Sequence, residues 1–330
     1  MIIPPKYILT PKISQLLASI EASRAIIDSI EIPVEIENNI RRRSTLESSL
    51  FSARIEGNTL TLNEVQNYPS QNQKKTEVYN LLKALNWLKE RSKKEVTLKD
   101  ILTYHQIVMN KLIDDENLGK FRKNPEAIFN SAGIAVFMAP PASKIEPLIK
   151  RLIKYSNSSK EQSISIRACL THFTFERIHP FLDGSGRVGR VLLQQVLIQG
   201  GYGMKGLLPL EEYWDNHRTL YYRVLEVSER DTTDYLEFML EAIAETANKI
   251  KELIKAKQKS DVSDFLLPRR GEIYSIIRDH KMVNLDFIHR RFMKVNQRTL
   301  RYDLKKLQDQ RLIKKLGTTR GVYYQTINLI

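Results

Sequence analysis

The sequence predicts a mostly α-helical protein with one small β-hairpin and a separate basic unit at its C-terminus. Apolar residues recur at helical spacing through most of residues 12–256. One stretch in that part, within 121–141, combines β-branched and aromatic residues around a turn. The polar segment at 257–264, KQKSDVSD, has no apolar anchor and predicts a linker. A helical domain is therefore expected before the linker and a second unit after it.

The composition is that of a globular protein. Hydrophobic residues make up 42% of the 330 residues and charged residues 27%, which is too apolar for a disordered chain and enough for a large core. No apolar run approaches the roughly 18 residues of a membrane helix, and the N-terminal MIIPPKYILTPK has no signal-peptide pattern. The single cysteine, Cys169, lies in an apolar stretch and is expected to be a core thiol. We expect a cytoplasmic protein that does not enter a membrane.

Two helices are predicted at the start of the chain. Residues 12–30 place apolar side chains at helical spacing, and residues 35–56 continue as a more polar helix. The second helix ends at Gly57 and Asn58, a typical C-terminal stop. The same periodicity predicts further helices at 74–91, 98–113, 144–155, 162–177, 187–199, 211–227 and 232–256.

The β-hairpin is predicted at about 126–139. Its sequence, AIFNSAGIAVFMAPP from residue 127 onward, has strand-forming residues on both sides of a Ser-Ala-Gly turn. Pro140 and Pro141 follow and prevent the second strand from continuing.

After the linker, the sequence predicts three helices and then two strands that flank a glycine turn, at 269–280, 284–292, 296–310, 312–316 and 322–327. In the third helix, Leu300, Leu304 and Leu307 share one face and can bury against the other two helices. This order of elements resembles a winged helix-turn-helix domain. The match is one of architecture and includes no diagnostic motif.

The positive charge of the chain is concentrated in this last unit. Residues 268–330 hold 15 Lys and Arg against 5 Asp and Glu, which gives +10 of the net +14. Such a density favours a polyanionic partner, and DNA is expected. A solvated charged face or a protein-docking module is the alternative. The candidate DNA contacts, on the exposed side of the third helix and in the turn between the strands, are Gln297, Arg298, Arg301, Lys305 and Arg320.

The segment that carries chemistry runs from His179 to Arg190, HPFLDGSGRVGR, between two predicted helices. Gly184 and Gly186 allow backbone conformations in which successive N–H groups converge on an anion. The next helix begins there, so its unpaired N–H groups and the positive end of its dipole face the loop. Arg187 and Arg190 lie three residues apart on one helix face and can fork onto phosphate oxygens. The segment therefore predicts a phosphate site.

Two side chains of this segment suit catalysis. Asp183 places a carboxylate beside the expected phosphates, as a Mg²⁺ ligand does. His179 precedes a proline, leaves the helix, and carries an imidazole suited to general-base work near neutral pH. The alternative is a structural loop whose arginines merely pair with acids. A metal site of His172, His179 and Asp183 is disfavoured because no further ligand follows metal spacing, so His172 is expected to be structural.

The segment resembles the Fic family signature HPFxDGNGRxxR. Gly119–Arg122, GKFR, is similar to the family's GxFR stretch, and the hairpin at about 126–139 is similar to its target-docking flap. Tyr221 and Tyr222 resemble the tyrosine pair near its adenine pocket. The resemblance covers about residues 40–255. It implies a helical Fic-type domain and a protein adenylyltransferase that moves AMP from ATP to a hydroxyl of a target protein or of itself.

The resemblance also implies a role for each motif residue. His179 would deprotonate the target hydroxyl, which attacks the α-phosphate, while Asp183 would hold Mg²⁺ and Phe181 would anchor the loop. The residues that would bind ATP are Gly184, Ser185, Gly186, Arg187 and Arg190 at the phosphates and Tyr221 and Tyr222 near the adenine. The flap residues that would align a target chain as an added strand are Ala135, Val136 and Phe137.

One motif position departs from the family, because Ser185 replaces the usual asparagine. A serine can still donate a hydrogen bond, but its side chain is shorter. We expect an altered phosphate contact and a lower rate.

A second motif lies at the end of the second helix. Ser52 and Glu56 share one helix face, and Glu56 lies at the negative end of the helix dipole, where a carboxylate needs a cationic partner. Arg54 or a surface lysine could supply that partner. The stretch SARIEG also resembles the Fic inhibitory motif (S/T)xxxE(G/N). In that interpretation Glu56 pairs with Arg190, occupies the γ-phosphate space, and holds ATP in an unproductive pose.

The predicted organisation has four parts: an N-terminal helical region at 1–115 with the inhibitory helix at about 35–57, a Fic core at 116–256, a linker at 257–267 and a winged helix at 268–330. A homodimer is a family-level expectation. Two alternatives to the adenylyltransferase stay open. One is a DNA-binding transcriptional regulator whose Fic domain senses nucleotide, and the other is an enzyme that removes AMP at the same site.

Overall fold

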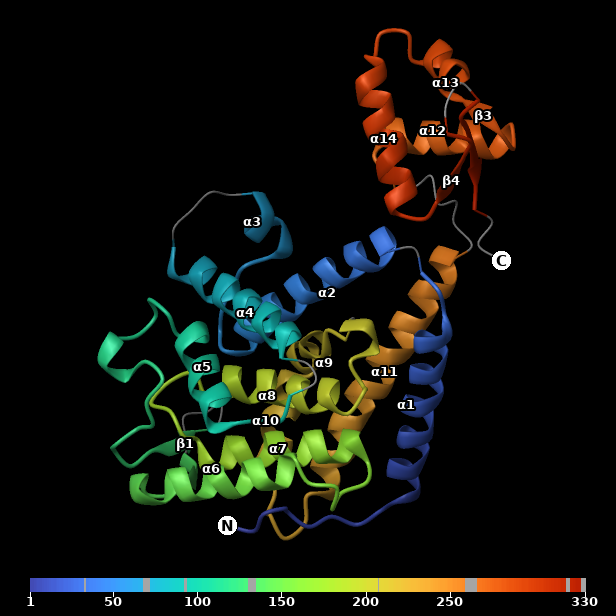
Figure 1. The fold of residues 1–330 in the computed structure, drawn as a ribbon. Coiled ribbons are helices and arrows are strands. Elements are labelled where there is room, and N and C mark those ends of the chain that lie inside the picture. The colour runs from blue at the N-terminus through green and yellow to red at the C-terminus, as the bar shows by residue number, and fades with distance from the viewer. Residues whose placement is uncertain are drawn as a thin grey trace. The chain divides into compact units, whose positions relative to one another are not determined.

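The structure is a computed structural model that describes residues 1–32, 34–67, 72–91, 94–129, 135–206, 208–258, 266–318 and 321–327. These residues are mostly helical, as predicted (Figure 1). The chain divides into two compact units. Unit 1 comprises Met1–Ser29 and Arg41–Lys251, and unit 2 comprises Ile30–Ile40 and Glu252–Ile330.

Up to residue 258, the described residues form helices and one small antiparallel sheet. Its α-helices are α1 (Pro11–Ser29), α2 (Val34–Ile55), α3 (Leu62–Asn67), α4 (Gln73–Glu90), α5 (Leu98–Val108), α6 (Ala142–Ser156), α7 (Ile164–Ile178), α8 (Ser185–Gln199), α9 (Leu210–Asn216), α10 (Arg218–Leu225) and α11 (Thr233–Gln258). Two short 3-10 helices are η1 (Asp115–Asn117) and η2 (Met204–Gly206). The sheet pairs β1 (Ala127–Phe129) with β2 (Ala135–Met138).

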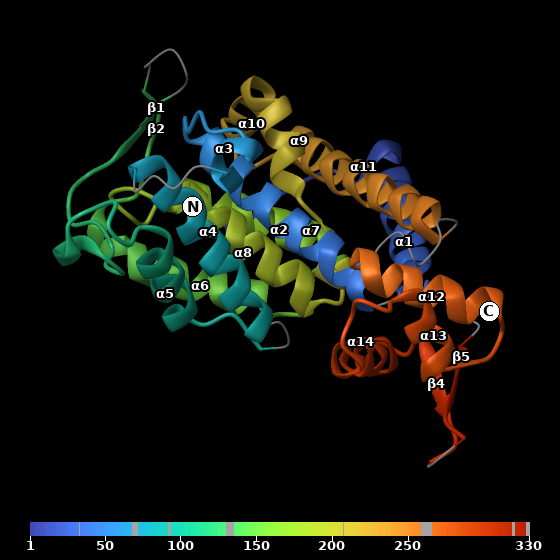
Figure 2. The ribbon, with the colours of Figure 1, turned by 90° about the horizontal axis from the view of Figure 1, so that it is seen from above.

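Helices α7 and α8 form the core of unit 1. They pack against each other, while α6 covers α7 and both α4 and α5 contact α8 (Figures 1 and 2). Twelve of the fifteen residues in each are buried, including the predicted core thiol Cys169. A helix buried on all sides belongs to a core rather than to a surface. The short connection between α7 and α8 is therefore held at both ends by rigid structure.

Three elements of this part differ from the sequence prediction. Helix α5 stops at Val108, earlier than predicted, and Lys111 just beyond it adopts the left-handed φ of 61°. The helix predicted at 211–227 is broken into α9 and α10 at His217, whose ψ of 35° is not helical. The prediction misses α3, although Thr61 and Glu64 cap its start through a hydrogen bond of 2.8 Å.

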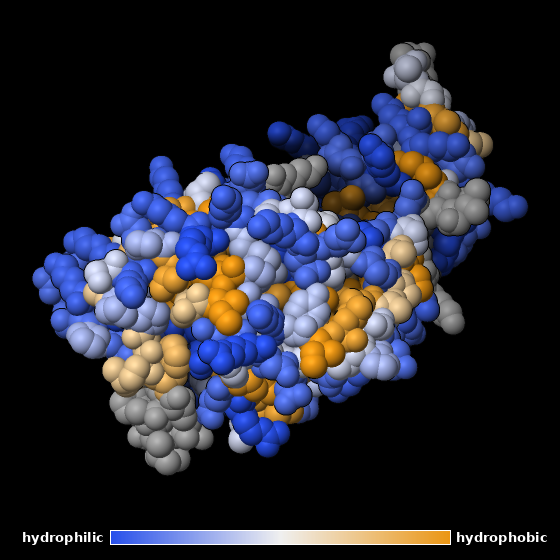
Figure 3. Space-filling view, turned by 90° about the horizontal axis from the view of Figure 1, so that it is seen from below, coloured by the Kyte–Doolittle hydropathy of each residue, from blue (hydrophilic) through white to orange (hydrophobic). Residues whose placement is uncertain are grey.

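None of the described helices is long and apolar enough to cross a membrane. On the face drawn in Figure 3, hydrophilic side chains predominate and apolar side chains form small separate groups.

In its described residues, unit 2 holds three predicted helices and a three-stranded antiparallel sheet. The elements are α12 (Pro268–Asp279), β3 (Val283–Asn284), α13 (Leu285–Arg291), α14 (Gln297–Asp309), β4 (Ile313–Leu316) and β5 (Tyr323–Thr326). The strand order is β3-β5-β4, with Tyr324 of β5 between Val283 and Lys315. Leu300, Leu304 and Leu307 are fully buried, as predicted. Strand β3 is missed because two residues are too short to show an alternating pattern.

A buried carboxylate also joins α14 to α12. Asp303 is 1% exposed and pairs with Nε of Arg269 at 2.6 Å and with Nε of Arg270 at 2.9 Å. A carboxylate buried this deeply needs such partners, because an unpaired buried charge is strongly destabilising.

Candidate active site

His179 lies where α7 ends. It adopts the left-handed conformation, with φ 44° and ψ 66°, and the following Pro180 cannot continue a helix. Its N–H still donates to the carbonyl of Phe175 at 3.0 Å. Burial lowers the pKa of the His179 imidazole, and Nδ1 is buried without a hydrogen-bond partner among the described residues. A neutral imidazole with an unused nitrogen can accept a proton, as a general base must.

Arg122 ties this loop to the base of the hairpin. Its Nε donates to the carbonyl of His179 at 2.8 Å, and its backbone N–H donates to the carbonyl of Pro180 at 2.9 Å. Its Nη1 and Nη2 donate to the carbonyls of Asn124 at 2.7 Å and Pro140 at 2.6 Å. One buried guanidinium therefore links the loop with both sides of the hairpin.

His105 on α5 supports the loop from the other side. Its Nε2 lies 3.0 Å from the carbonyl of Asp183, and its Nδ1 accepts from the N–H of Gly119 at 2.9 Å. Its ring stacks on the fully buried ring of Phe181 at a centroid distance of 3.9 Å. Burial lowers the pKa of His105 to about 4, so the ring is neutral at pH 7. His105 was not predicted from the sequence, because nothing near it in the chain relates it to a loop more than seventy residues later.

The loop turns into α8 at Gly184. This residue has φ 82°, and a Cβ there would lie 2.5 Å from the sulfur of Met109, so the position requires glycine. The N–H of Val188 makes the first helical hydrogen bond, to the carbonyl of Gly184 at 3.0 Å. The three N–H groups before it have no partner inside the helix and form the start of an anion-binding turn.

The side chain of Ser185 is used within the loop. Its Oγ accepts from the N–H of Phe181 at 3.1 Å and lies 3.3 Å from the carbonyl of the same residue. Ser185 is only 1% exposed. A phosphate contact of this residue would therefore use the backbone N–H rather than the hydroxyl.

Arg187 is held between two carboxylates. Its Nη2 donates to Oδ1 of Asp183 at 2.6 Å, and its Nη1 donates to Oε1 of Glu77 on α4 at 2.5 Å. Oε2 of Glu77 accepts in turn from the side-chain amide of Asn58 at 2.8 Å. Glu77 was not predicted as a site residue, because no sequence motif marks it.

Arg190 contacts the end of α2. Its Nε donates to Oγ of Ser52 at 2.9 Å, and its Nη2 donates to the carbonyl of Ser52 at 2.9 Å and to Oε1 of Glu56 at 2.7 Å. Arg190 is 1% exposed, so this ion pair is shielded from solvent on one side. Arg54, the alternative partner considered for Glu56, pairs with Asp215 at 3.0 Å instead.

The Glu56 carboxylate lies against the anion-binding turn itself. A Cβ added to Gly186 would lie 2.7 Å from Oε1 of Glu56. Burial opposes the ionisation of Glu56, but Arg190 and Arg187 outweigh it and lower the pKa of the carboxyl. Glu56 is therefore an anion resting where the turn would hold a phosphate oxygen.

A further hydrogen bond holds α2 in place at Ser48, one helical turn before Ser52. Ser48 donates to Oε2 of Glu211 on α9 at 2.5 Å. Glu211 is 2% exposed, and burial raises the pKa of its carboxyl from 4.5 to about 7. The folded protein therefore binds a proton at Glu211 over a pH range in which the unfolded chain has lost it.

Glu211→Gln is expected to remove a pH-dependent destabilisation. The free energy of unfolding of the native protein should fall as the pH rises from 4.5 to 7, because the folded state holds the extra proton. Relative to the native protein, the variant should gain on the order of 2 kcal/mol between pH 5 and pH 8. Thermal melting at both pH values measures this, with Glu212→Gln at the more exposed neighbouring position as the control. An equal change in both variants would contradict the prediction.

The two predicted adenine-pocket tyrosines lie in different surroundings. The hydroxyl of Tyr222 donates to the carbonyl of Ile55 at 3.0 Å, next to Glu56. Tyr221 is 1% exposed, and its hydroxyl lies 3.1 Å from Nε2 of His172. His172 is fully buried, and its Nδ1 lies 2.9 Å from the hydroxyl of Tyr235. Among the described residues, no three His, Cys, Asp or Glu side chains group as a metal site.

The hairpin is the antiparallel pair β1 and β2. Phe129 pairs with Ala135 and Ile128 with Phe137, with an irregularity between Ile128 and Phe129. Val136, the third predicted flap residue, lies within β2. The Arg177 guanidinium lies 3.7 Å from the ring centroid of Phe137, which holds this end of β2 to α7. The predicted turn between the strands lies outside the described residues.

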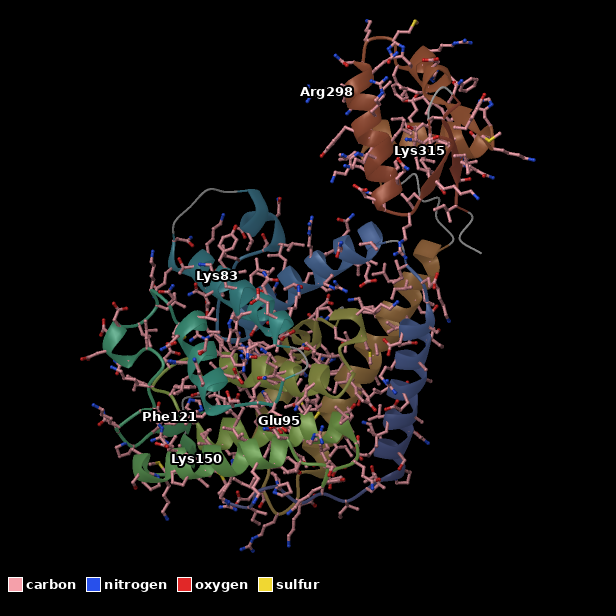
Figure 4. All side chains as sticks on the ribbon, viewed as in Figure 1. Lys83, Glu95, Phe121, Lys150, Arg298 and Lys315 are labelled. Carbon is pink, nitrogen blue, oxygen red and sulfur yellow. The ribbon has the colours of Figure 1, made fainter. Side chains whose placement is uncertain are left out.

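The predicted DNA contacts lie in unit 2. Arg298, Arg301 and Lys305 are exposed on α14, where Oε1 of the half-buried Gln297 accepts from Arg301 at 3.3 Å. The fifth candidate, Arg320, lies outside the described residues. Figure 4 shows Arg298 on α14 and Lys315 on β4.

Comparison with known proteins points to the region around the connection between α7 and α8. Residues 95–197, which include the whole connection between α7 and α8, match the Fic/DOC family. Protein adenylyltransferase Fic of Drosophila willistoni is 26% identical over 243 residues, covering 70% of this chain and 46% of that protein. The corresponding protein of Drosophila virilis is 25% identical, with 70% and 47% covered. The chain spans about half the length of the curated relatives it matches.

Solved structures share the fold. A Fic family protein from Desulfovibrio desulfuricans G20 has a TM-score of 0.67 at 24% identity and covers 98% of both chains. Fic-1 from C. elegans has a TM-score of 0.59 at 20% identity, covering 75% of this chain and 73% of that one.

Proposed function

Because residues 95–197 form a domain of the Fic/DOC family, we propose that this chain is a protein adenylyltransferase that transfers AMP from ATP to a hydroxyl side chain of a protein. The connection between α7 and α8 is the main support. It joins the imidazole of His179 to an anion-binding turn with two arginines, Arg187 and Arg190. An imidazole suits a hydroxyl nucleophile, and the turn suits the phosphates of ATP.

The proposed step forms one bond and breaks one. The target hydroxyl oxygen attacks the α-phosphorus, and His179 takes the hydroxyl proton. The bond from that phosphorus to the oxygen bridging to the β-phosphate breaks, and pyrophosphate leaves. The backbone N–H groups at the start of α8, with Arg187 and Arg190, balance the charge on the phosphates.

Asp183 fits the Mg²⁺ that accompanies ATP. Its carboxylate is 55% exposed and already turns toward Arg187, one of the phosphate-binding candidates. Mg²⁺ in such sites is held by one or two carboxylates together with substrate phosphates, so a single aspartate suffices. When bound, the ion would neutralise phosphate charge.

Two labelled nucleotides test the transfer. The chain is incubated with Mg²⁺ and ATP labelled at either the α- or the γ-phosphate, and label on protein is read from a gel. Label from the α-phosphate alone supports AMP transfer, and label from the γ-phosphate would show a kinase instead. ATP binding without any label favours a nucleotide-sensing regulator. Loss of AMP from a pre-labelled protein favours the reverse reaction.

Two finer features belong to this proposal. Glu56 would inhibit the site by holding Arg190 and the anion-binding turn in the absence of a competing phosphate. A target chain would pair with β2 along Ala135–Phe137, a mode of recognition that depends little on side chains.

A second function, DNA binding by unit 2, is supported by the exposed basic face of α14. Arg298→Ala and Arg301→Ala should each weaken binding to duplex DNA and lower the slope of log affinity against log salt by about 1. Arg278→Ala on α12, where the side chain pairs with Asp279, is the control. Fluorescence anisotropy across salt concentrations measures both. Binding that does not respond to salt would point to a protein-docking unit.

A further inference from the structure

Three buried polar side chains from different helices meet in the core of unit 1. They are Tyr221 on α10, His172 on α7 and Tyr235 on α11, and each is at most 1% exposed. Buried polar groups need hydrogen-bond partners, because leaving one unsatisfied costs stability. The partners of these three side chains determine where each proton lies.

The positions of the protons follow from the Tyr235 hydroxyl. It donates to the carbonyl of Cys169 at 2.9 Å, and a carbonyl can only accept. The oxygen of Tyr235 is therefore the acceptor toward Nδ1 of His172, which lies 2.9 Å away. Burial lowers the pKa of His172 to about 3, so the ring is neutral and carries one proton. That proton is on Nδ1, which leaves Nε2 as an acceptor.

Tyr221 continues this chain of hydrogen bonds to Arg190. Its hydroxyl lies 3.1 Å from Nε2 of His172, and because Nε2 accepts, the hydroxyl donates. The oxygen of Tyr221 then keeps its lone pairs for another donor. Burial raises the pKa of Tyr221, while the charge of Arg190 and a side-chain hydrogen bond with it act in the opposite direction. Arg190, Tyr221, His172 and Tyr235 thus each donate to the next.

Glu176 is an alternative partner for Nε2 of His172, and the distances favour Tyr221. Oε1 of Glu176 lies 3.6 Å from Nε2, against 3.1 Å for the Tyr221 hydroxyl. Burial raises the pKa of the Glu176 carboxyl to about 8, so it carries no charge at pH 7 that would attract Arg190. The hydroxyl of Tyr221 therefore remains between the imidazole and the guanidinium.

Tyr221 is held differently from the partners of Arg190 on α2. In the proposed mechanism Glu56 gives up its contact with Arg190 when a phosphate takes its place. The Tyr221 ring stacks on the fully buried Trp214 at a centroid distance of 5.7 Å, and its hydroxyl is bound to His172 on the core helix α7. Nothing in that exchange requires Tyr221 to move, so it can hold Arg190 both before and after Glu56 leaves.

We propose that the Tyr221 hydroxyl, oriented by His172 and Tyr235, is a positioning group that directs Arg190 toward the outer phosphates of ATP. This inference rests on the proposed function. It assigns Tyr221 to the phosphates, through Arg190, rather than to the adenine that the resemblance implies. The burial of Tyr221 supports the choice, because a side chain that is 1% exposed offers almost no surface to a base.

Nucleotides of different length test the assignment. Tyr221→Phe keeps the ring and removes the hydroxyl, and calorimetry with Mg²⁺-ATP and with AMP is done in the Glu56→Gly background, where no carboxylate competes for Arg190. Affinity for ATP should fall about tenfold, the contribution of one hydrogen bond to a charged group. Affinity for AMP, which lacks the outer phosphates, should not change. Tyr104→Phe is the matched control, since it removes another fully buried hydroxyl that bonds to α8, at Gln195.

Initial rates of AMP transfer give a second measurement on the same variants. Tyr221→Phe should raise KM for ATP about tenfold and leave kcat nearly unchanged, whereas Tyr104→Phe should change neither. Equal losses of ATP and AMP affinity would place Tyr221 at the adenine. A Tyr221→Phe variant that matches Tyr104→Phe in every constant would make Tyr221 a packing residue. Either result overturns the proposal.

The proton positions can be measured without a nucleotide. In ¹⁵N NMR of histidine-labelled chain, the signal that is lost in His172→Gln should show a proton on Nδ1, and Tyr235→Phe should shift the proton toward Nε2. A proton on Nε2 in the native chain overturns the proposal. ATP binding with the expected losses but no AMP transfer would instead remove the proposed function and leave the role of Tyr221 in place. No ATP binding in any variant would overturn both.

Discussion

Replacing His179 with alanine is expected to lower AMP transfer by about three orders of magnitude, the usual contribution of a general base. The loss should fall on kcat, because in the proposed mechanism the start of α8 would hold the phosphates and the imidazole would not. Initial rates with α-labelled ATP measure it, and a separate titration should show ATP binding as in the native chain. His217→Ala, an exposed histidine between α9 and α10, is the control. A His179→Ala variant with native turnover would falsify the assignment.

The pH dependence of AMP transfer should reflect the burial of the His179 imidazole. Burial lowers the pKa of His179, so the neutral base persists below the ordinary value of 6.5. The rate should therefore fall only at pH values below 6.5 as the imidazole gains a proton. Removing Glu56, whose charge raises this pKa, should move the fall to still lower pH. A fall centred above 6.5 would contradict a buried base.

Replacing Glu56 with glycine is expected to raise the rate of AMP transfer at least about tenfold. A charge-assisted hydrogen bond such as the one from Arg190 to Glu56 contributes more than about 1.4 kcal/mol, and this free energy corresponds to a factor of about ten. The change frees Arg190 and removes a carboxylate from the turn at Gly186. Glu56→Gln, which keeps a hydrogen-bond acceptor without the charge, should have an intermediate rate. Glu90→Gly, at the exposed last residue of α4, is the control. An unchanged rate in Glu56→Gly would rule out inhibition by this contact.

The same substitution should make the protein less stable. Arg190 is almost fully buried, and without Glu56 its charge has no carboxylate at that contact. Breaking a fully buried ion pair typically costs about 3–5 kcal/mol. Because the Glu56 side chain is 30% exposed, the loss should be smaller than this, but the melting temperature should still fall. Added ATP should restore more stability to Glu56→Gly than to the native chain. Higher activity together with lower stability would distinguish a released inhibitory contact from general damage to the site.

The sequence predicted what depends on local pattern. Helical periodicity located most of the helices, and it placed the His179–Arg190 segment where α7 passes into α8. The motif at Ser52 and Glu56 pointed to Arg190, and the structure places these three together. In each case the information lies within one turn of a helix or one short loop.

The rest depends on contacts between distant parts of the chain. Three residues reach their partners only after folding: Glu77 contacts Arg187 on α8, His105 contacts the loop at Asp183, and Glu211 contacts Ser48 on α2. Each of them lies in an ordinary helical pattern in the sequence. Asp303 falls on the buried side of α14, where a periodicity argument expects an apolar residue. The break at His217 has no glycine or proline to mark it. Contacts between polar and charged residues far apart in the chain were therefore the main feature that could not be predicted from the sequence.

Arg122 has a consequence for how a target would be selected. One guanidinium fixes the distance between the base of the hairpin, at Asn124 and Pro140, and the residue that carries the imidazole. A chain docked along β2 would thus be selected by the position of its residues along the strand and not by the identity of its side chains. Any segment that can extend itself would dock, and the hydroxyl that reacts would be the one whose backbone register brings it to the imidazole. The choice of the hydroxyl that is modified would then depend on its position along the docked segment.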